Sequence, residues 1–182
     1  MRLSLVGAVL LALLGGQGGA VLAQAGAEGP TLTPVTGTQA SFELVAYPEV
    51  GTEGSIETYR GVQFRRTFEW SDPRLPSLLL SNVNSNWHVT DEGEVSEFAQ
   101  THRLVGEESD WVGTEYGFQE EGLGSSLGLH VYRGEGAYEG LSAMIARGDV
   151  VDEAGNTGTE CSGYIFESEL PPMPDPVEPP AG

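Results

Sequence analysis

Polar side chains that can bind or protonate a small molecule recur at alternate positions in two neighbouring segments. Gln100 and His102 occupy the same set of alternate positions as the apolar residues of one segment, and Thr114 and Tyr116 do so in the next segment. Alternate residues of an extended chain point to one side, so these four are predicted to lie together on an inner face. Arg66, from an earlier segment with the same pattern, is predicted to join them. Ligand sites are mostly apolar with a few directed polar groups, so the set predicts a polar clamp in a cavity.

A purely structural explanation of these side chains remains open. Buried polar groups normally have hydrogen-bond partners, so His102 could bond to a neighbour on the same face. Arg66 could reach a carboxylate at the rim, such as Glu139 or Glu43. A bulge at residues 65–66 could also turn the arginine outward.

A glycine-rich turn, "RGEGAYEGL" at residues 133–141, adds Arg133 and Glu139, which are predicted to face each other. No residue is assigned a catalytic role, and no cofactor is expected. An enzymatic alternative, a barrel isomerase or cyclase, would use Tyr116, His102 and Arg66. The candidate ligand-binding residues are Arg66, Gln100, His102, Thr114, Tyr116, Arg133 and Glu139.

The three histidines of the chain are predicted not to converge. The stretch "SNVNSNWHV" (81–89) places its asparagines and His88 on the outer face, where His88 is predicted to pair with Glu97. His130 is also predicted outside, whereas His102 points inward. A zinc site needs its ligands around one ion, so a histidine metal site is rejected.

An acidic loop at residues 148–156 offers oxygen ligands of the kind that Ca²⁺ prefers. It lacks the spacing of an EF-hand loop. Solvated turn residues therefore explain it more simply, although calcium binding stays open.

Alternation with period two, broken by Gly, Asp, Asn and Pro, predicts a chain of β-strands. Short strands at regular spacing predict an all-β, antiparallel meander that closes into an eight-stranded barrel, with a β-sandwich as the alternative. The predicted strands are residues 38–47, 57–70, 78–90, 95–105, 111–119, 127–133, 138–148 and 157–168.

Hairpin geometry predicts which residues oppose one another along the middle strands. A one-residue slip would move every side chain to the other face, so the chosen registers keep the apolar residues of all the hairpins on one inner face. The predicted opposed pairs include Trp87 with Phe98, Phe98 with Phe118, Tyr116 with Leu129, and Leu129 with Ala143.

The two ends of the chain have their own composition. Met1-Arg2, a short apolar run and small residues before a cut predict a secretory signal peptide at 1–23, and hence a secreted or envelope protein. Residues 24–37 are expected to be a flexible segment, 38–169 the barrel, and 170–182 a proline-rich disordered tail. Cys161 is the only cysteine and is predicted to be a buried apolar residue.

The charge of the chain narrows the classes of partner. It contains 27 acidic residues and eight basic ones, all arginine, for a formal net charge of −19. Such a field repels phosphate backbones and anionic lipid, so nucleic-acid binding is disfavoured. No segment of the mature chain is expected to insert into a membrane. The absence of lysine excludes Schiff-base chemistry.

Three short stretches, "SDPRLP" (71–76), "GEGAYEGL" (134–141) and "GYIFESELPP" (163–172), resemble a group of secreted bacterial proteins of unassigned function. The longer hairpin "GEGAYEGLSAMIARG" (134–148) is similar to the corresponding turn of the allene oxide cyclase and dirigent barrel superfamily. The resemblance implies an eight-stranded antiparallel barrel with an apolar cavity. It does not imply cyclase activity, and no catalytic residue of that superfamily aligns with this chain.

These patterns favour a secreted, non-catalytic barrel that binds a small apolar or amphipathic ligand or a surface partner. The enzymatic alternative and a structural role in the cell envelope remain open. The oligomeric state is not predicted.

Overall fold

The computed structural model describes residues 31–170, apart from residues 92, 121–124, 152–154 and 156. The predicted signal peptide and nearly all of the proline-rich tail lie outside this part of the chain. No helix among the described residues is long and apolar enough to cross a membrane.

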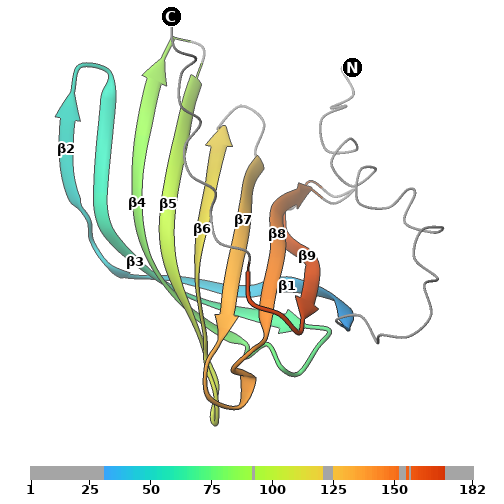
Figure 1. The fold of residues 1–182 in the computed structure, drawn as a ribbon. Coiled ribbons are helices and arrows are strands. Elements are labelled where there is room, and N and C mark those ends of the chain that lie inside the picture. Colours follow the sequence, from blue (N-terminus) through green and yellow to red (C-terminus); the bar gives the residue numbers. More distant parts are fainter. Residues whose placement is uncertain (1–30, 92, 121–124, 152–154, 156, 171–182) are drawn as a thin grey trace, which may run out of the picture.

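Nine antiparallel strands form one sheet that closes on itself (Figure 1). The sheet order is β1-β9-β8-β7-β6-β5-β4-β3-β2, and an additional β1–β3 pairing completes an eight-stranded barrel. The predicted antiparallel meander barrel is therefore confirmed. The strands are β1 (Leu32–Ala46), β2 (Glu49–Glu53), β3 (Ile56–Trp70), β4 (Leu78–Thr90), β5 (Gly93–Val105), β6 (Trp111–Glu120), β7 (Ser125–Gly134), β8 (Ser142–Val151) and β9 (Thr157–Phe166).

Strand β1 closes the barrel by pairing with two different neighbours. Its first half, Leu32–Thr38, pairs with β9, and its second half, Gly37–Ala46, pairs with β3. A register shift between Gln39 and Ser41 marks the bend between the two halves, as expected of a bulge that increases strand curvature. Residues 32–37, expected in a flexible segment, are thus part of the barrel wall.

Two further local differences separate the predicted and observed elements. The short strand β2 was not predicted. It pairs with the N-terminal part of β3 and lies outside the closed ring of strands. Residues 138–141 are not strand, because the 3₁₀ helix η2 (Gly136–Tyr138) and a turn precede β8. Gly136 and Gly140 have positive φ angles there, of 61° and 86°, which side chains other than glycine rarely adopt.

The end of the barrel where β3 joins β4 is filled, and we call it the base. The β3–β4 loop plugs it: the indole nitrogens of Trp111 and Trp70 donate to the carbonyls of Arg74 and Pro76, at 2.7 and 3.1 Å. Cys161 is buried here as predicted. The buried cluster is Val35, Phe68, Leu75, Leu79, Leu104, Trp111, Tyr132, Ala143, Ile145, Cys161 and Ile165. The opposite end, where β2 joins β3 and β4 joins β5, is the mouth.

The predicted β4–β5 register is wrong by two residues. Trp87 lies opposite Ser96, and Phe98 lies opposite Ser85. A shift of two preserves the faces of both strands. His102 and Gln100 therefore point inward as predicted.

The predicted β5–β6 register is wrong by one residue, which turns β6 over. Phe98 lies opposite Gly117 instead of Phe118, so Glu115 is buried whereas Tyr116 is 70 % exposed. The physical reason is space. A Cβ atom at the inward-facing Gly113 or Gly117 would collide with the ring of Tyr132 or Phe98.

The next two hairpins complete the correction. The β6–β7 register is as predicted, with Tyr116 opposite Leu129, so β7 is also turned over and His130 points inward. The β7–β8 register differs by three residues, because Leu129 faces Ala146 instead of Ala143. The β5–β6 and β7–β8 registers are both wrong by an odd number of residues, so their effects on the inward face cancel. Ala143 and Ile145 of β8 are therefore buried, as predicted.

Candidate functional site

A carboxylate, Glu115, lies at the centre of the barrel and is fully buried. The sheet register places Gln100 of β5 and His130 of β7 directly opposite it on either side. Gln100 Nε2 donates to Glu115 Oε2 at 2.6 Å, and Arg147 Nε of β8 donates to Oε1 at 2.9 Å. Gly128 makes room for this carboxylate, since a Cβ atom at that position would collide with it.

Two histidines and a tyrosine lie beside Glu115. His102 Nε2 and His130 Nε2 are 3.3 and 3.5 Å from Glu115 Oε2. The Tyr132 hydroxyl lies 3.2 Å from His102 Nδ1 and 2.9 Å from His130 Nδ1. The three donor groups of His102, Glu115 and His130 lie within 4.8 Å of one another and could hold a metal ion.

Burial sets the protonation states of this cluster. It lowers the pKa of His102, and it lowers that of His130 well below its ordinary value, although Glu115 opposes both effects. Burial alone would raise the pKa of Glu115, but contacts with His102, His130 and Arg147 outweigh it and lower that pKa to about 2. At neutral pH the carboxylate is ionised and both imidazoles are neutral.

Arg66 of β3 is a second buried arginine inside the barrel. Its Nε and Nη1 atoms have no hydrogen-bond partner among the described residues. Its guanidinium carbon lies 5.4 and 5.2 Å from the ring centroids of Phe42 and Phe64. Burial and the nearby Arg147 lower the pKa of Arg66 to about 10, so the side chain remains a cation at neutral pH.

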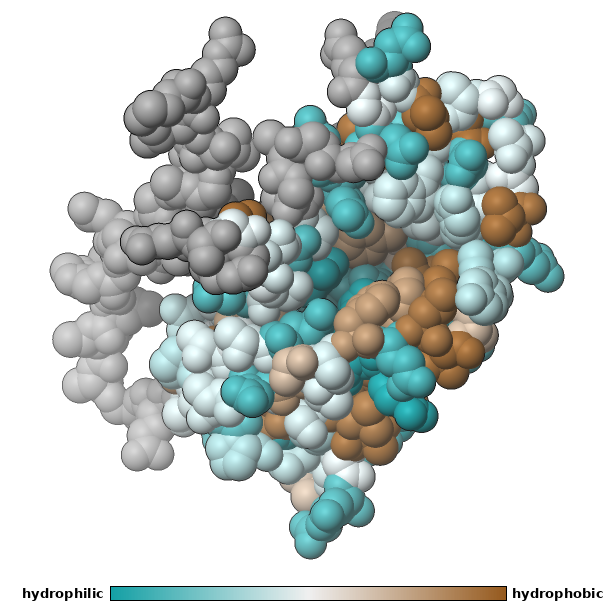
Figure 2. All heavy atoms as spheres, turned by 180° about the vertical axis from the view of Figure 1, so that it is seen from behind, coloured by the Kyte–Doolittle hydropathy of each residue, from teal (hydrophilic) through white to brown (hydrophobic). Residues whose placement is uncertain are grey.

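A cavity of about 800 Å³ opens above this cluster toward the mouth. Figure 2 shows the hollow from behind, with hydrophilic residues in its depth and hydrophobic residues along its right-hand edge. Arg66, Gln100 and Arg147 line its lower part. Its apolar lining comprises Phe42, Leu44, Val50, Val62, Phe64, Val83, Trp87 and Phe98.

Three acidic residues also line the cavity. Glu57 accepts a hydrogen bond from the Tyr59 hydroxyl at 2.7 Å. Asp149 accepts bonds from the Ser126 amide and the Thr159 hydroxyl, at 3.0 and 2.8 Å. Glu94 is the third.

The structure brings together three of the seven predicted ligand-binding residues. Arg66, Gln100 and His102 are buried inside the barrel. Arg66 does not turn outward at a bulge; its neighbour Arg65 faces solvent and pairs with Glu43 at 3.5 Å.

The other four predicted residues lie outside the barrel, which corrects the prediction. Thr114 and Tyr116 follow the inverted face of β6 and are exposed. Arg133 lies opposite Ser142, not Glu139, and both charged residues are exposed. The three residues that the enzymatic alternative would use, Tyr116, His102 and Arg66, are therefore not brought together.

Sequence reasoning missed four residues of the interior cluster: Glu115, His130, Tyr132 and Arg147. Glu115, His130 and Tyr132 share their parity with glycines, such as Gly113, Gly117 and Gly128, and not with the apolar residues that guided the register. Arg147 shares the parity of the apolar residues of β8 and was overlooked. One signal in the sequence could have revealed the inner face of β6 and β7. Interior positions of small barrels often alternate between small and large side chains, so glycines at alternate positions, next to large residues on the neighbouring strand, indicate an inward face.

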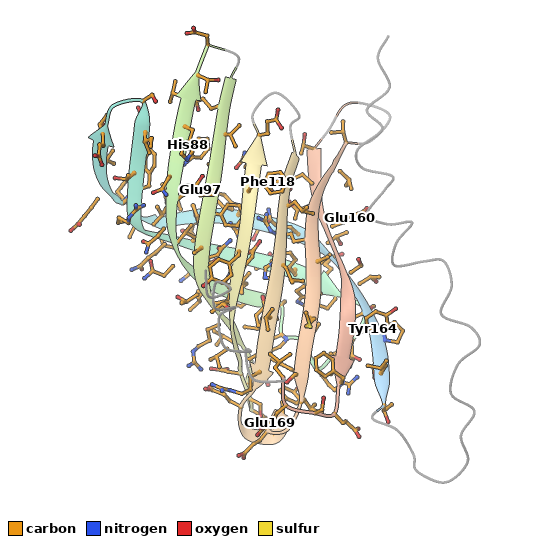
Figure 3. The ribbon with its side chains drawn as sticks, turned by 45° about the horizontal axis from the view of Figure 1, so that its top comes forward. His88, Glu97, Phe118, Glu160, Tyr164 and Glu169 are labelled. Atoms are coloured by element: carbon orange, nitrogen blue, oxygen red, sulfur yellow. The ribbon has the colours of Figure 1, made fainter. Side chains whose placement is uncertain are left out.

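The outer face contains the predicted His88–Glu97 pair, which is confirmed at 2.8 Å. Figure 3 labels both residues near the mouth, His88 on β4 and Glu97 on β5. The pair is diagonal, because His88 lies opposite Val95 in the observed register. The rejection of any histidine metal site rested on His130 pointing outward, and that premise is wrong. Asp152, Glu153 and Asn156 of the possible calcium loop lie outside the described residues.

Comparisons with protein-family models, with curated proteins and with solved structures found no match.

Proposed function

We propose that this protein is a secreted, non-catalytic barrel that binds a small amphipathic ligand, with an anionic head group on Arg66 and an apolar body in the cavity. The observation that carries the proposal is the buried guanidinium of Arg66 in the lining of an open apolar cavity, whose Nε and Nη1 atoms have no hydrogen-bond partner among the described residues. A buried cation without a hydrogen-bonding counter-ion is costly. A carboxylate would supply that counter-ion.

The charge balance inside the barrel supports an anion in particular. Arg66, Arg147 and Glu115 are the buried charged residues around the cavity, and Glu115 is already hydrogen-bonded to Arg147. One positive charge is therefore left over among these three buried groups, although Glu57, Glu94 and Asp149 line other parts of the cavity. Guanidinium groups form strong charge-assisted hydrogen bonds to carboxylates, and the Nε and Nη1 atoms of Arg66 have no hydrogen-bond partner among the described residues.

The cavity walls support an apolar body. Phe42 and Leu44 are 52 % and 40 % exposed although they line the cavity. Val50, near the mouth, is 61 % exposed. Each square ångström of apolar surface removed from water contributes about 25 cal/mol, so a hydrocarbon chain placed against these residues would stabilise the complex.

A matched pair of arginines tests the proposal. The probe is a fluorescent medium-chain carboxylic acid, compared with its methyl ester. Arg66→Met should weaken binding of the acid by about tenfold or more, because it removes a charge-assisted hydrogen bond worth about 1.5–3 kcal/mol. Binding of the ester should stay within about twofold.

Arg65→Met is the control, because Arg65 is the adjacent residue on the outer face. It should leave the affinities of acid and ester unchanged. The proposal is wrong if wild-type protein binds the acid no better than the ester, or if Arg66→Met keeps the preference for the acid.

Three further parts of the proposal rest on sequence. Secretion rests on the N-terminal pattern, and N-terminal sequencing of exported protein tests cleavage after Ala23. Kinship with the allene oxide cyclase and dirigent barrels rests on strand order and on the turn at residues 134–148, without cyclase activity. The acidic net charge of −19 supports a partner that is neither nucleic acid nor an anionic membrane surface.

A further inference from the structure

We propose that His102, His130 and Glu115 form a divalent-metal site, with Zn²⁺ as the ion that fits best. The Nε2 atoms of the two histidines lie 3.3 and 3.5 Å from Glu115 Oε2. In a tetrahedral zinc site with metal–ligand bonds of about 2.0–2.1 Å, neighbouring ligand atoms are about 3.3–3.4 Å apart. Both histidine nitrogens are thus close to this spacing from the Glu115 oxygen, and the three ligand atoms lie within 4.8 Å of one another.

The hydrogen-bonding state of the two imidazoles points to a missing ligand. Both Nε2 atoms are buried and lack a hydrogen-bond partner among the residues described. Each neutral imidazole has one N–H hydrogen and one lone pair. If the hydrogens are on Nε2, the two Nδ1 atoms, 3.2 Å apart, face each other as acceptors. If both are on Nδ1, two lone pairs face the Glu115 carboxylate. In the mixed state one Nδ1 donates to the other, and one lone pair still faces the carboxylate.

A cation between the Nε2 atoms and Glu115 removes this conflict. Both lone pairs then bind the metal, and both Nδ1 atoms carry hydrogen. The Tyr132 hydroxyl oxygen, 2.9 Å from His130 Nδ1 and 3.2 Å from His102 Nδ1, can accept from both. Metal-binding histidines usually donate their second nitrogen to an oxygen in this way, so Tyr132 fits the role of a positioning residue.

The other neighbours of the site orient Glu115 and moderate its affinity for a cation. Gln100 and Arg147 hold the carboxylate through one oxygen each, at 2.6 and 2.9 Å. Arg147 and Arg66 are positively charged, so they weaken the binding of a metal cation nearby. Three protein ligands also leave a fourth position for water or for another ligand.

Metal titration of mature, untagged, metal-free protein tests the proposal. Calorimetry with Zn²⁺, and the visible absorption of Co²⁺ in a tetrahedral site, should each give one ion per chain. His102→Gln and His130→Gln should each weaken Zn²⁺ binding by about 100-fold or more, because each removes a ligand. Tyr132→Phe, which keeps all three ligands, should weaken it by about 10- to 100-fold.

His88→Gln is the matched control, since His88 is the remaining histidine and lies outside the barrel beside Glu97. It should leave the zinc affinity unchanged. Circular dichroism shows whether each variant keeps the barrel. The proposal is overturned if wild-type protein binds Zn²⁺ no tighter than folded His130→Gln, or if His88→Gln abolishes binding.

Arg66→Met separates this proposal from the proposed function. It removes a like charge near the histidines, so Zn²⁺ should bind roughly threefold tighter or more, whereas the anionic probe should bind more weakly. Loss of Zn²⁺ binding in folded Arg66→Met protein would contradict the metal site. An unchanged affinity for the carboxylic acid would contradict the proposed function alone.

Discussion

At the scale of single residues, Glu115 organises the interior of the barrel. Acidic residues are almost never fully buried unless they are paired, and here the partners come from three strands: Gln100 on β5, His130 on β7 and Arg147 on β8. The partners lie up to 47 residues apart along the chain. A local pattern does not reveal such a long-range arrangement, so Glu115 was not predicted although Gln100 and His102 were.

Cys161 gives a prediction about pH. Burial raises the pKa of its thiol from an ordinary value of 9.0 to about 12. A group that keeps its proton in the folded state but loses it in the unfolded state makes unfolding more favourable as pH rises. We expect the free energy of unfolding of wild-type protein to fall, relative to that of Cys161→Ala, as pH rises above about 9.

Urea unfolding of both proteins at pH 7 and pH 10.5 measures this difference. The tyrosines and arginines are the same in both chains, so their titration cancels in the comparison. Parallel pH profiles for the two proteins would show that the thiol is not protected by burial.

At the scale of the strand, β6 shows how far periodicity predicts structure. Its bounds, 111–120, agree with the predicted 111–119 to within one residue, because alternation and turn residues are local signals. The prediction exchanged the two faces of this strand, because the alternate apolar residues Val112, Tyr116 and Phe118 have the pattern of a face that packs in the core. The true inner face contains Gly113 and Gly117, and the volume there is filled by side chains of neighbouring strands.

Gly128→Ala tests this packing directly. A methyl group at that position would overlap the Glu115 carboxylate, and overpacking typically costs about 1–3 kcal/mol. We expect a loss of unfolding free energy of at least that size, because the bonds to Gln100 and Arg147 must also shift.

Gly148→Ala is the control for this change. Among the described residues, its added methyl group would meet only the Ser126 carbonyl oxygen, at an ordinary contact distance of 3.9 Å. Chemical unfolding should show a change within about 0.5 kcal/mol for this variant. Equal effects of the two substitutions would mean that the space beside Glu115 is not tightly packed.

At the scale of the whole molecule, the number and order of the barrel strands followed from sequence. Regular strand spacing with short connections leaves few topologies other than a meander. The auxiliary strand β2 escaped prediction because all five of its residues are exposed, so it has no apolar alternation. The closure of β1 onto β3 depends on a bend in β1 that no local sequence pattern predicts.

The overall charge leads to a prediction about binding kinetics. The net charge of −19 repels an approaching anion over a distance that shrinks from about 30 Å at 0.01 M salt to about 8 Å at 0.15 M. We therefore expect the association rate of the carboxylic acid probe to rise with salt over this range.

Stopped-flow mixing with the methyl ester provides the reference for that measurement, because an uncharged probe should associate at a constant rate. A rate for the acid that falls as salt is added would mean that local positive charge at the mouth, not the field of the whole protein, controls entry.

The residues that the structure describes form no continuous wall on one side of the mouth. Within the described part of the chain, strand β2 pairs with β3 alone, and the residues of β9 near the mouth, Thr157–Thr159, pair only with β8. These two edges lie on opposite sides of the molecule in Figure 1. A bound hydrocarbon tail could leave through this gap and grow without meeting protein. The barrel would then select its ligands by head group and tolerate a wide range of chain lengths.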